Sequence, residues 1–112
     1  MMKTNSHSIE KTFELSIKKY LTDRGWEVIK VGSHKKGWPD LTCFRSGVTF
    51  FIETKKGNGG RIGFYQAKTV KRLRSLGFRA EFIEDWQQFL DYYEEIIGDW
   101  NGIIQVSKGR HI

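Results

Sequence analysis

The sequence has 112 residues, enough for one domain with a single hydrophobic core. Hydrophobic residues make up 38% of it, which excludes a disordered chain and predicts a packed fold. The 19 Lys and Arg residues outnumber the 13 Asp and Glu residues, and the formal net charge of +6 favours a polyanionic partner such as nucleic acid. A basic protein without such a partner is the alternative.

The single cysteine, Cys43, excludes an intrachain disulfide and is expected to be a buried, reduced thiol. No apolar segment is long enough to cross a membrane, and the polar N-terminus lacks the apolar centre of a secretory signal. A cytoplasmic protein with no membrane partner is therefore expected.

The first half of the chain predicts a helix followed by three strands. After a frayed leader over 1–7, Ser8 is expected to cap a helix that runs from about Ile9 to Gly25. Strands are predicted over 26–31, 40–44 and 48–55, with a loop over 32–37. The last two strands form a hairpin because a short turn containing Gly47 joins them.

The second half adds two helices and a strand. We expect a flexible loop over 57–60, a helix over 64–76 that stops at Gly77, a strand over 78–83, and a helix that Asp85 caps and Gly98 ends. No element is predicted for 99–112. The order predicts one α/β domain over 1–112, with its core at about 9–98 and a central mixed sheet of about four strands flanked by helices.

Two acidic residues interrupt apolar stretches. Asp40 opens one predicted strand, and Glu53 lies inside the next, where an ionised carboxylate is costly without a compensating cation. Strand pairing would bring Asp40 to Glu53 at the end of the hairpin, and two converging carboxylates favour Mg²⁺ or Mn²⁺. Lys55 projects from the same face as Glu53, where an ammonium can orient a water or offset charge on a phosphate. This set predicts phosphodiester hydrolysis. The alternative is an exposed Glu–Lys pair, with Asp40 a turn residue.

Two helical polar residues support the same site. Glu14 falls within the apolar stripe of the first helix, with Glu10 on the same face, and Gln66 lies on the inner face of the second helix. A polar group on an inward face needs a partner, and a shared metal-and-water site would supply one. The alternatives are a carboxylate aided by the helix dipole for Glu14 and a backbone bond for Gln66.

Trp38-Pro39-Asp40, followed after twelve residues by Glu53-Thr54-Lys55, resembles the signature of the PD-(D/E)XK nuclease superfamily. Gly37 to Leu41, Phe51 to Lys55 and the pair Tyr65-Gln66 most resemble its VRR-NUC branch, with the archaeal Holliday junction resolvases a close second. The resemblance covers about residues 9–83.

The resemblance implies a restriction-endonuclease-like core with Mg²⁺, or Mn²⁺ in its place, held by Asp40, Glu53 and the Thr54 carbonyl. Lys55 would then position the nucleophilic water, Glu14 would complete the metal or water shell, and Gln66 would support the site. In the resolvases a helical glutamate precedes the glycine that ends the first helix by eleven residues, as Glu14 precedes Gly25 here; Glu10 is held in reserve. Members of the branch often come from phages or mobile elements, and some act as dimers on branched DNA.

Basic residues near this motif are expected to contact DNA phosphates, which give affinity without sequence specificity. The candidates are His34, Lys35, Lys36, Arg61 and Lys68. A solvated face is the alternative for each. Apolar residues after 99 would supply the interface of a homodimer. The sequence thus predicts a metal-dependent DNA endonuclease, structure-selective for branched DNA such as Holliday junctions; the alternative is a non-catalytic DNA-binding module on a degenerate nuclease scaffold.

Overall fold

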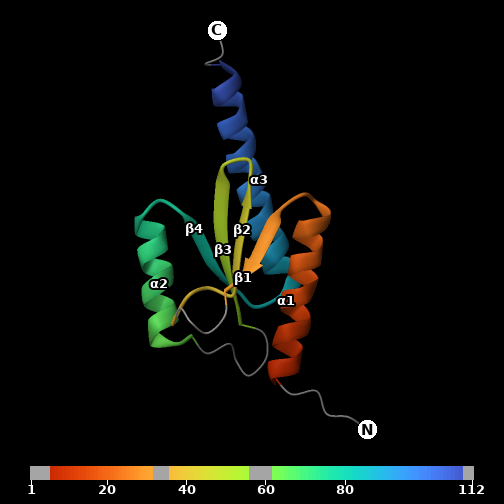
Figure 1. Cartoon of the computed structure of the whole chain (residues 1–112), viewed down its shortest axis with the longest axis vertical. Helices are drawn as coiled ribbons and strands as arrows, with labels where there is room; N and C mark the ends of the chain where they lie inside the picture. The colour runs from red at the N-terminus through yellow and green to blue at the C-terminus, as the bar shows by residue number, and fades with distance from the viewer. Residues whose placement is uncertain (1–5, 32–35, 56–61, 110–112) are drawn as a thin grey trace.

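The structure is a computed structural model that describes residues 6–31, 36–55 and 62–109, with side chains described over 11–31, 36–55 and 62–99. In chain order its elements are α1 (Ser6–Asp23), β1 (Glu27–Lys30), β2 (Leu41–Arg45), β3 (Val48–Thr54), α2 (Phe64–Ser75), β4 (Arg79–Ile83) and α3 (Trp86–Gly109). Figure 1 shows the helices arranged around a central sheet, with α3 extending well beyond the sheet at one end.

The sheet is mixed and has the strand order β1-β2-β3-β4. β1, β2 and β3 pair antiparallel, and β4 joins β3 in parallel. Ser46 and Gly47 close the β2–β3 hairpin with φ values of 52° and 83°, the positive values that a tight two-residue turn requires. The parallel pair needs a crossover connection, which α2 supplies. The predicted α/β domain with a mixed sheet is confirmed.

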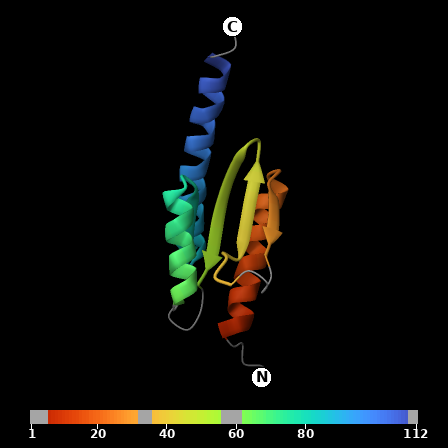
Figure 2. The same cartoon turned by 60° about the vertical axis from the view of Figure 1, so that its left-hand side comes forward.

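Two hydrophobic cores lie on opposite faces of the sheet, because side chains alternate along each strand. Phe50 and Ile52 of β3 face α1 and α3 in the larger core, while Phe51 faces α2 in the smaller one. Cys43 is fully buried in the larger core, as predicted. The core contacts thus place α2 on one side of the sheet and α1 and α3 on the other. In Figure 2 the strands lie between α2 at the left and α1 at the right.

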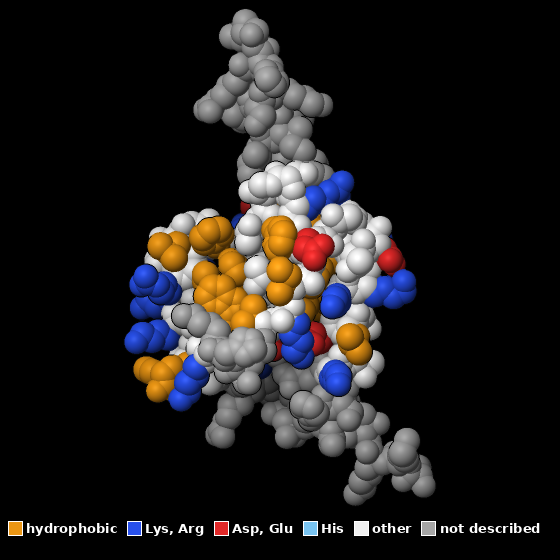
Figure 3. All heavy atoms as spheres, in the orientation of Figure 1, with side chains coloured by type: hydrophobic (Ala, Val, Ile, Leu, Met, Phe, Trp, Pro, Cys, Tyr) orange, Lys and Arg blue, Asp and Glu red, His pale blue; other side chains and the backbone are white. Residues whose placement is uncertain are grey.

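α2 leaves part of its face of the sheet exposed. Ile29 of β1 and Phe44 of β2 point to the same face as Phe51, and their side chains are 44% and 39% exposed. Figure 3 shows hydrophobic side chains gathered on this face. The exposed strip is therefore a surface on which another molecule can pack.

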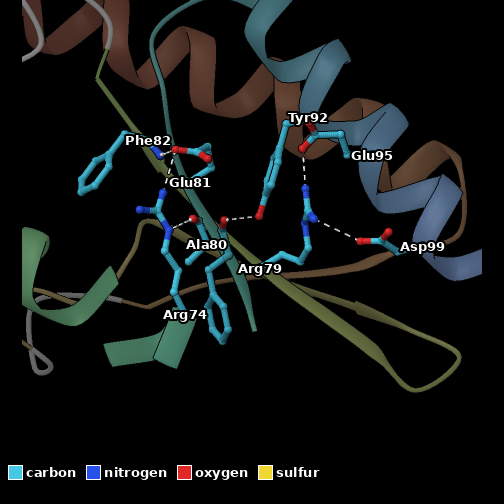
Figure 4. A network of polar contacts seen from close by, with 9 residues as sticks. Arg74, Arg79, Ala80, Glu81, Phe82, Tyr92, Glu95 and Asp99 are labelled. Atoms are coloured by element: carbon cyan, nitrogen blue, oxygen red, sulfur yellow. Dashed lines mark hydrogen bonds and ion pairs between the residues drawn. The ribbon is translucent and has the colours of Figure 1, made fainter. Parts of the chain in front are cut away.

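A polar network fixes the two helices beside β4 (Figure 4). Arg79 of β4 forms ion pairs with Glu95 and Asp99 of α3, and Arg74 of α2 pairs with Glu81 of β4. Both arginines line a cavity of about 260 Å³ at the N-terminal end of β4. Because both arginines are paired with carboxylates, the network serves to attach α2 and α3 to the sheet.

Two predicted helix boundaries are wrong. Ser8 lies inside α1, which begins at Ser6, so part of the expected leader is helical. α3 passes through Gly98 and continues to Gly109, into the segment for which no element was predicted. A glycine inside a helix costs only about 1 kcal/mol relative to alanine, so the neighbouring helix-forming residues can override it.

The other predicted elements agree with the structure to within one or two residues. α1 and α2 end just before Gly25 and Gly77, and Asp85 accepts a hydrogen bond from the backbone N–H of Gln88 at 2.9 Å, the N-cap that was predicted. The predicted loop over 57–60 lies outside the described residues. No described helix has the length and apolarity needed to span a membrane.

Candidate active site

A cleft of about 320 Å³ lies where β1 and β3 end, β2 begins and the first turns of α2 approach the sheet. Its lining residues are Lys11, Glu14, Lys30, Asp40, Glu53, Thr54, Lys55 and Gln66. The structure thus brings together every residue that was predicted to act in catalysis or metal binding. It adds Lys11 and Lys30, which sequence reasoning missed.

The hairpin register places Asp40 against the end of β3. Leu41 pairs with Ile52, so the next position places Asp40 opposite Glu53, and paired residues share one face of a sheet. The Asp40 backbone N–H donates to Glu53 Oε1 at 3.0 Å. Asp40 Oδ2 accepts from the backbone N–H and the hydroxyl of Thr54, at 2.9 and 2.7 Å. Hydrogen bonds therefore hold both carboxylates at the same end of the hairpin.

Glu53 is the most buried acid in the cleft, with 2% of its surface exposed. Burial, and after it the negative charge of Asp40, raise its pKa from 4.5 to about 7, although the Lys55 ammonium acts in the opposite direction. Lys55 Nζ lies 3.2 Å from Glu53 Oε2. Burial is the largest cause and Lys55 offsets it only in part, so additional positive charge beside Glu53 would favour its ionised form.

Gln66 connects α2 to these residues. Its Nε2 donates to Glu53 Oε2, and its Oε1 accepts from Lys55 Nζ and from the Gly63 backbone N–H, both at 3.0 Å. Sequence reasoning offered a site contact or a backbone bond for Gln66, and the structure contains both. The amide therefore fixes the first turn of α2 against the acid and the lysine.

Glu14 enters the cleft from α1 and is 6% exposed. Its Oε2 accepts a hydrogen bond from Lys30 Nζ at 2.7 Å, and this bond raises the pKa of Lys30. Lys30 ends β1 and points to the same face as Val28, because side chains two residues apart in a strand share a face. The alternation of side chains along β1, together with the position of Lys30 at the end of that strand, could have identified it as a residue of the cleft.

The family model described as archaeal Holliday junction resolvase (Hjc) matches residues 5–80, which include every acid of the cleft. The chain belongs to the archaeal Holliday junction resolvase family. Among solved structures, one described as a VRR_NUC domain matches with a TM-score of 0.68 and 24% sequence identity, covering 76% of this chain and 94% of that chain. No curated protein matches the chain. The predicted resemblance to the archaeal Holliday junction resolvases is confirmed, and the likeness to the VRR_NUC structure confirms the predicted fold.

Two of the three acids in the cleft of this resolvase-family chain, Asp40 and Glu53, suit a divalent cation. Among the described residues, none donates a hydrogen bond to Asp40 Oδ1, and the Glu53 oxygens keep lone pairs beyond those that accept hydrogen bonds. Oxygen donors with a deficit of positive charge suit Mg²⁺, which retains several waters as ligands. Across the described residues no cluster of three or more Asp, Glu, His or Cys side chains surrounds one point. Glu14 is paired with Lys30, so the fit comes from Asp40 and Glu53.

Of the residues predicted to contact DNA, the two that the structure describes, Lys36 and Lys68, do not line the cleft. Lys36 and Lys68 are exposed, and Lys36 Nζ lies 4.2 Å from the centroid of the Tyr65 ring. His34, Lys35 and Arg61 lie outside the described residues. The cations that the structure does place in the cleft are Lys11, Lys30 and Lys55.

Proposed function

We propose that this chain is a metal-dependent endonuclease that hydrolyses DNA phosphodiester bonds, with branched DNA as its substrate. The observation that carries the proposal is the convergence of Asp40, Glu53 and Lys55 in one cleft of a resolvase-family fold. Two fixed carboxylates beside an ammonium meet the needs of phosphodiester hydrolysis better than those of DNA binding alone, because DNA repels carboxylates.

Asp40, Glu53 and the Thr54 carbonyl would hold Mg²⁺, for which Mn²⁺ would substitute. When bound, the cation lowers the pKa of a water ligand and withdraws charge from the phosphate. Lys55 orients the attacking water and offsets negative charge that grows on the phosphate, because its Nζ lies 3.2 Å from Glu53. Gln66 keeps both side chains in place through its two polar atoms.

Glu14 has a different proposed part from the two central acids. Its pairing with Lys30 places a carboxylate and an ammonium on the α1 side of the cleft. We assign Glu14 to the water shell of the metal site, and Lys30 to a phosphate of the bound strand. Glu10, the reserve candidate, has no described side chain.

Phosphate contacts would come from exposed cations around the cleft. Lys36 and Lys68 are exposed, and we retain His34, Lys35 and Arg61 as proposed contacts from the flanking loops. Affinity should fall steeply with salt, since each contacted phosphate releases counterions.

A homodimer matches a branched substrate, because two symmetric sites can cut two symmetric strands. The predicted interface after residue 99 has no described side chains. The exposed Ile29 and Phe44 on the open part of the sheet offer a second surface for the contact between copies. Sedimentation at working concentration tests the dimer, and a monomer with full cleavage activity would remove it.

A cleavage panel tests the proposed reaction. Four-way junctions, flaps and linear duplexes would be incubated with Mg²⁺ or Mn²⁺ and either the wild type or Lys55→Met, with the exposed Lys71→Met as matched control. We expect cleavage of branched DNA that Lys55→Met reduces about 100-fold or more, with DNA binding retained. DNA binding by the wild type without cleavage of any substrate would favour the non-catalytic binding module instead.

A further inference from the structure

Two large aromatic side chains lie exposed beside the cleft. Phe64 and Tyr65 form the first turn of α2 and are 72% and 49% exposed. Their rings meet edge to face with centroids 5.3 Å apart. Figure 3 shows hydrophobic and basic side chains together at the lower left, over the end of the molecule where α2 begins in Figure 1. Neither ring belongs to a hydrophobic core, so core packing does not explain them.

The position of Tyr65 is tightly fixed. A Cβ atom at Gly37 would lie 2.7 Å from the Tyr65 carbonyl carbon, so the loop before Asp40 packs directly on the backbone of this turn. Lys36, next in that loop, places its ammonium 4.2 Å from the Tyr65 ring centroid, a cation–π contact. The aromatic pair is thus attached to the loop that carries Asp40.

The same turn is attached to the other side of the cleft. Gln66 follows Tyr65 directly and bonds both Glu53 and Lys55. The backbone of this turn is therefore fixed relative to the carboxylates, and Phe64 and Tyr65 directly precede a residue that lines the cleft.

We propose that Phe64 and Tyr65 form a stacking platform for an unpaired DNA base next to the scissile phosphate. This inference depends on the proposed function, because it names the substrate class of the same site. Bases stack on exposed aromatic rings, whereas a base inside a closed duplex is already stacked and paired. Lys36 supplies the cation for the phosphate attached to that base. The platform therefore selects DNA with an unpaired base at a branch point.

Fluorescence of 2-aminopurine tests the platform without cleavage. The base analogue is placed unpaired beside the branch of a junction, or paired within a linear duplex, and each probe is titrated in EDTA. The wild type should quench the unpaired probe, and Phe64→Ala/Tyr65→Ala should bind it about 10-fold or more weakly with no quenching. Binding to the duplex should change less than about 2-fold. Leu76→Ala is the matched control, since this side chain is 59% exposed at the other end of α2.

Further variants keep the test decisive. Tyr65→Phe should retain quenching because its ring is intact. If the double variant unfolds by circular dichroism, Phe64→Ala alone replaces it, since that side chain is mostly exposed. Equal binding of both probes by the variant and the wild type, or an equal loss on both, overturns the proposal. A changed sedimentation coefficient with quenching unchanged assigns the pair to a contact between copies, and also overturns it.

The two proposals fail in different ways. Absence of cleavage with Mg²⁺ or Mn²⁺ sinks the nuclease assignment, while the EDTA titration still measures stacking. Absence of quenching with intact cleavage sinks only the platform.

Discussion

The side-chain amide of Gln66 donates a hydrogen bond from Nε2 to Glu53 Oε2 at 2.5 Å. The same amide accepts from Lys55 through Oε1, so one side chain of α2 positions both the acid and the lysine of the cleft. α2 packs on β4 and against Phe51 of β3, and Gln66 connects this helix to the acid and the lysine of the site.

Gln66→Ala should reduce cleavage about 10- to 100-fold, mainly through kcat, because Glu53 and Lys55 lose the group that orients them. The affinity for DNA measured in EDTA should change little. Gln87→Ala, an exposed glutamine of α3, is the control. Unchanged kcat in Gln66→Ala would show that the amide only caps α2.

Glu53→Gln should stabilise the metal-free protein at pH 8. The pKa of Glu53 is raised from 4.5 to about 7 in the folded state, so folding favours the protonated acid. Stability contributed by that proton is full below about pH 4.5 and is lost as the pH rises through about 7. Above pH 7 the ionised Glu53 therefore lowers the free energy of unfolding by an amount on the order of 3 kcal/mol. Thermal unfolding in EDTA should be measured from about pH 5 to about pH 8, the range over which Glu53 loses its proton in the folded state. The Tm of Glu53→Gln should depend less on pH than the Tm of the wild type.

The same variant tests the metal. Mg²⁺ should raise the Tm of the wild type and leave that of Glu53→Gln unchanged, since the variant lacks one carboxylate ligand. Glu94→Gln, an exposed acid of α3, should behave as the wild type. For the stability prediction above, a Glu53→Gln protein with a lower Tm than the wild type at pH 8 in EDTA would contradict the view that the buried Glu53 charge destabilises the metal-free fold.

Lys30→Met should destabilise the protein by about 1 kcal/mol, because the buried Glu14 carboxylate loses its partner while the half-exposed lysine is screened by solvent. Glu14→Gln added to it should restore most of that loss, giving a positive coupling in a double-mutant cycle. Urea unfolding of the four proteins provides the cycle. Strictly additive effects would show that the pair contributes nothing to stability.

Gly37→Ala should cost about 2 kcal/mol or more, because its φ of +79° disfavours a side chain and the added Cβ would meet the Tyr65 backbone at 2.7 Å. Gly47→Ala is the matched control: its φ is +83°, and nothing lies within 4 Å of the added atom. It should cost about 1 kcal/mol. Equal losses of the free energy of unfolding in the two variants would contradict the close approach of the loop to α2.

The centre of the site could be predicted from local patterns because it lies within one hairpin. The turn at Gly47 sets the register of β2 and β3, and the register places Asp40 opposite Glu53 with Lys55 on the same face. Gln66 was identified because the helical period points it inward. Their catalytic roles remain predictions.

The rim of the site could not be predicted in the same way. Lys11 and Lys30 enter the cleft through the packing of α1 on the sheet and the pairing of β1, which are long-range contacts without a local sequence pattern. The exposure of Phe64 and Tyr65 also depends on where α2 lies, since aromatic residues are usually placed in a core. The error at Gly98 has a local cause, because a glycine is only a weak helix terminator.

The central claim is that Asp40 and Glu53 together hold a cation that is needed to cut DNA. Single-turnover cleavage of a four-way junction, followed as Mg²⁺ is titrated, tests it most directly when the wild type is compared with Asp40→Asn and with the exposed Asp91→Asn. We predict saturable Mg²⁺ dependence for the wild type and Asp91→Asn, and a loss of about 100-fold or more in rate for Asp40→Asn with junction binding retained. Cleavage by Asp40→Asn at the wild-type rate, or wild-type cleavage that persists in EDTA, would contradict it.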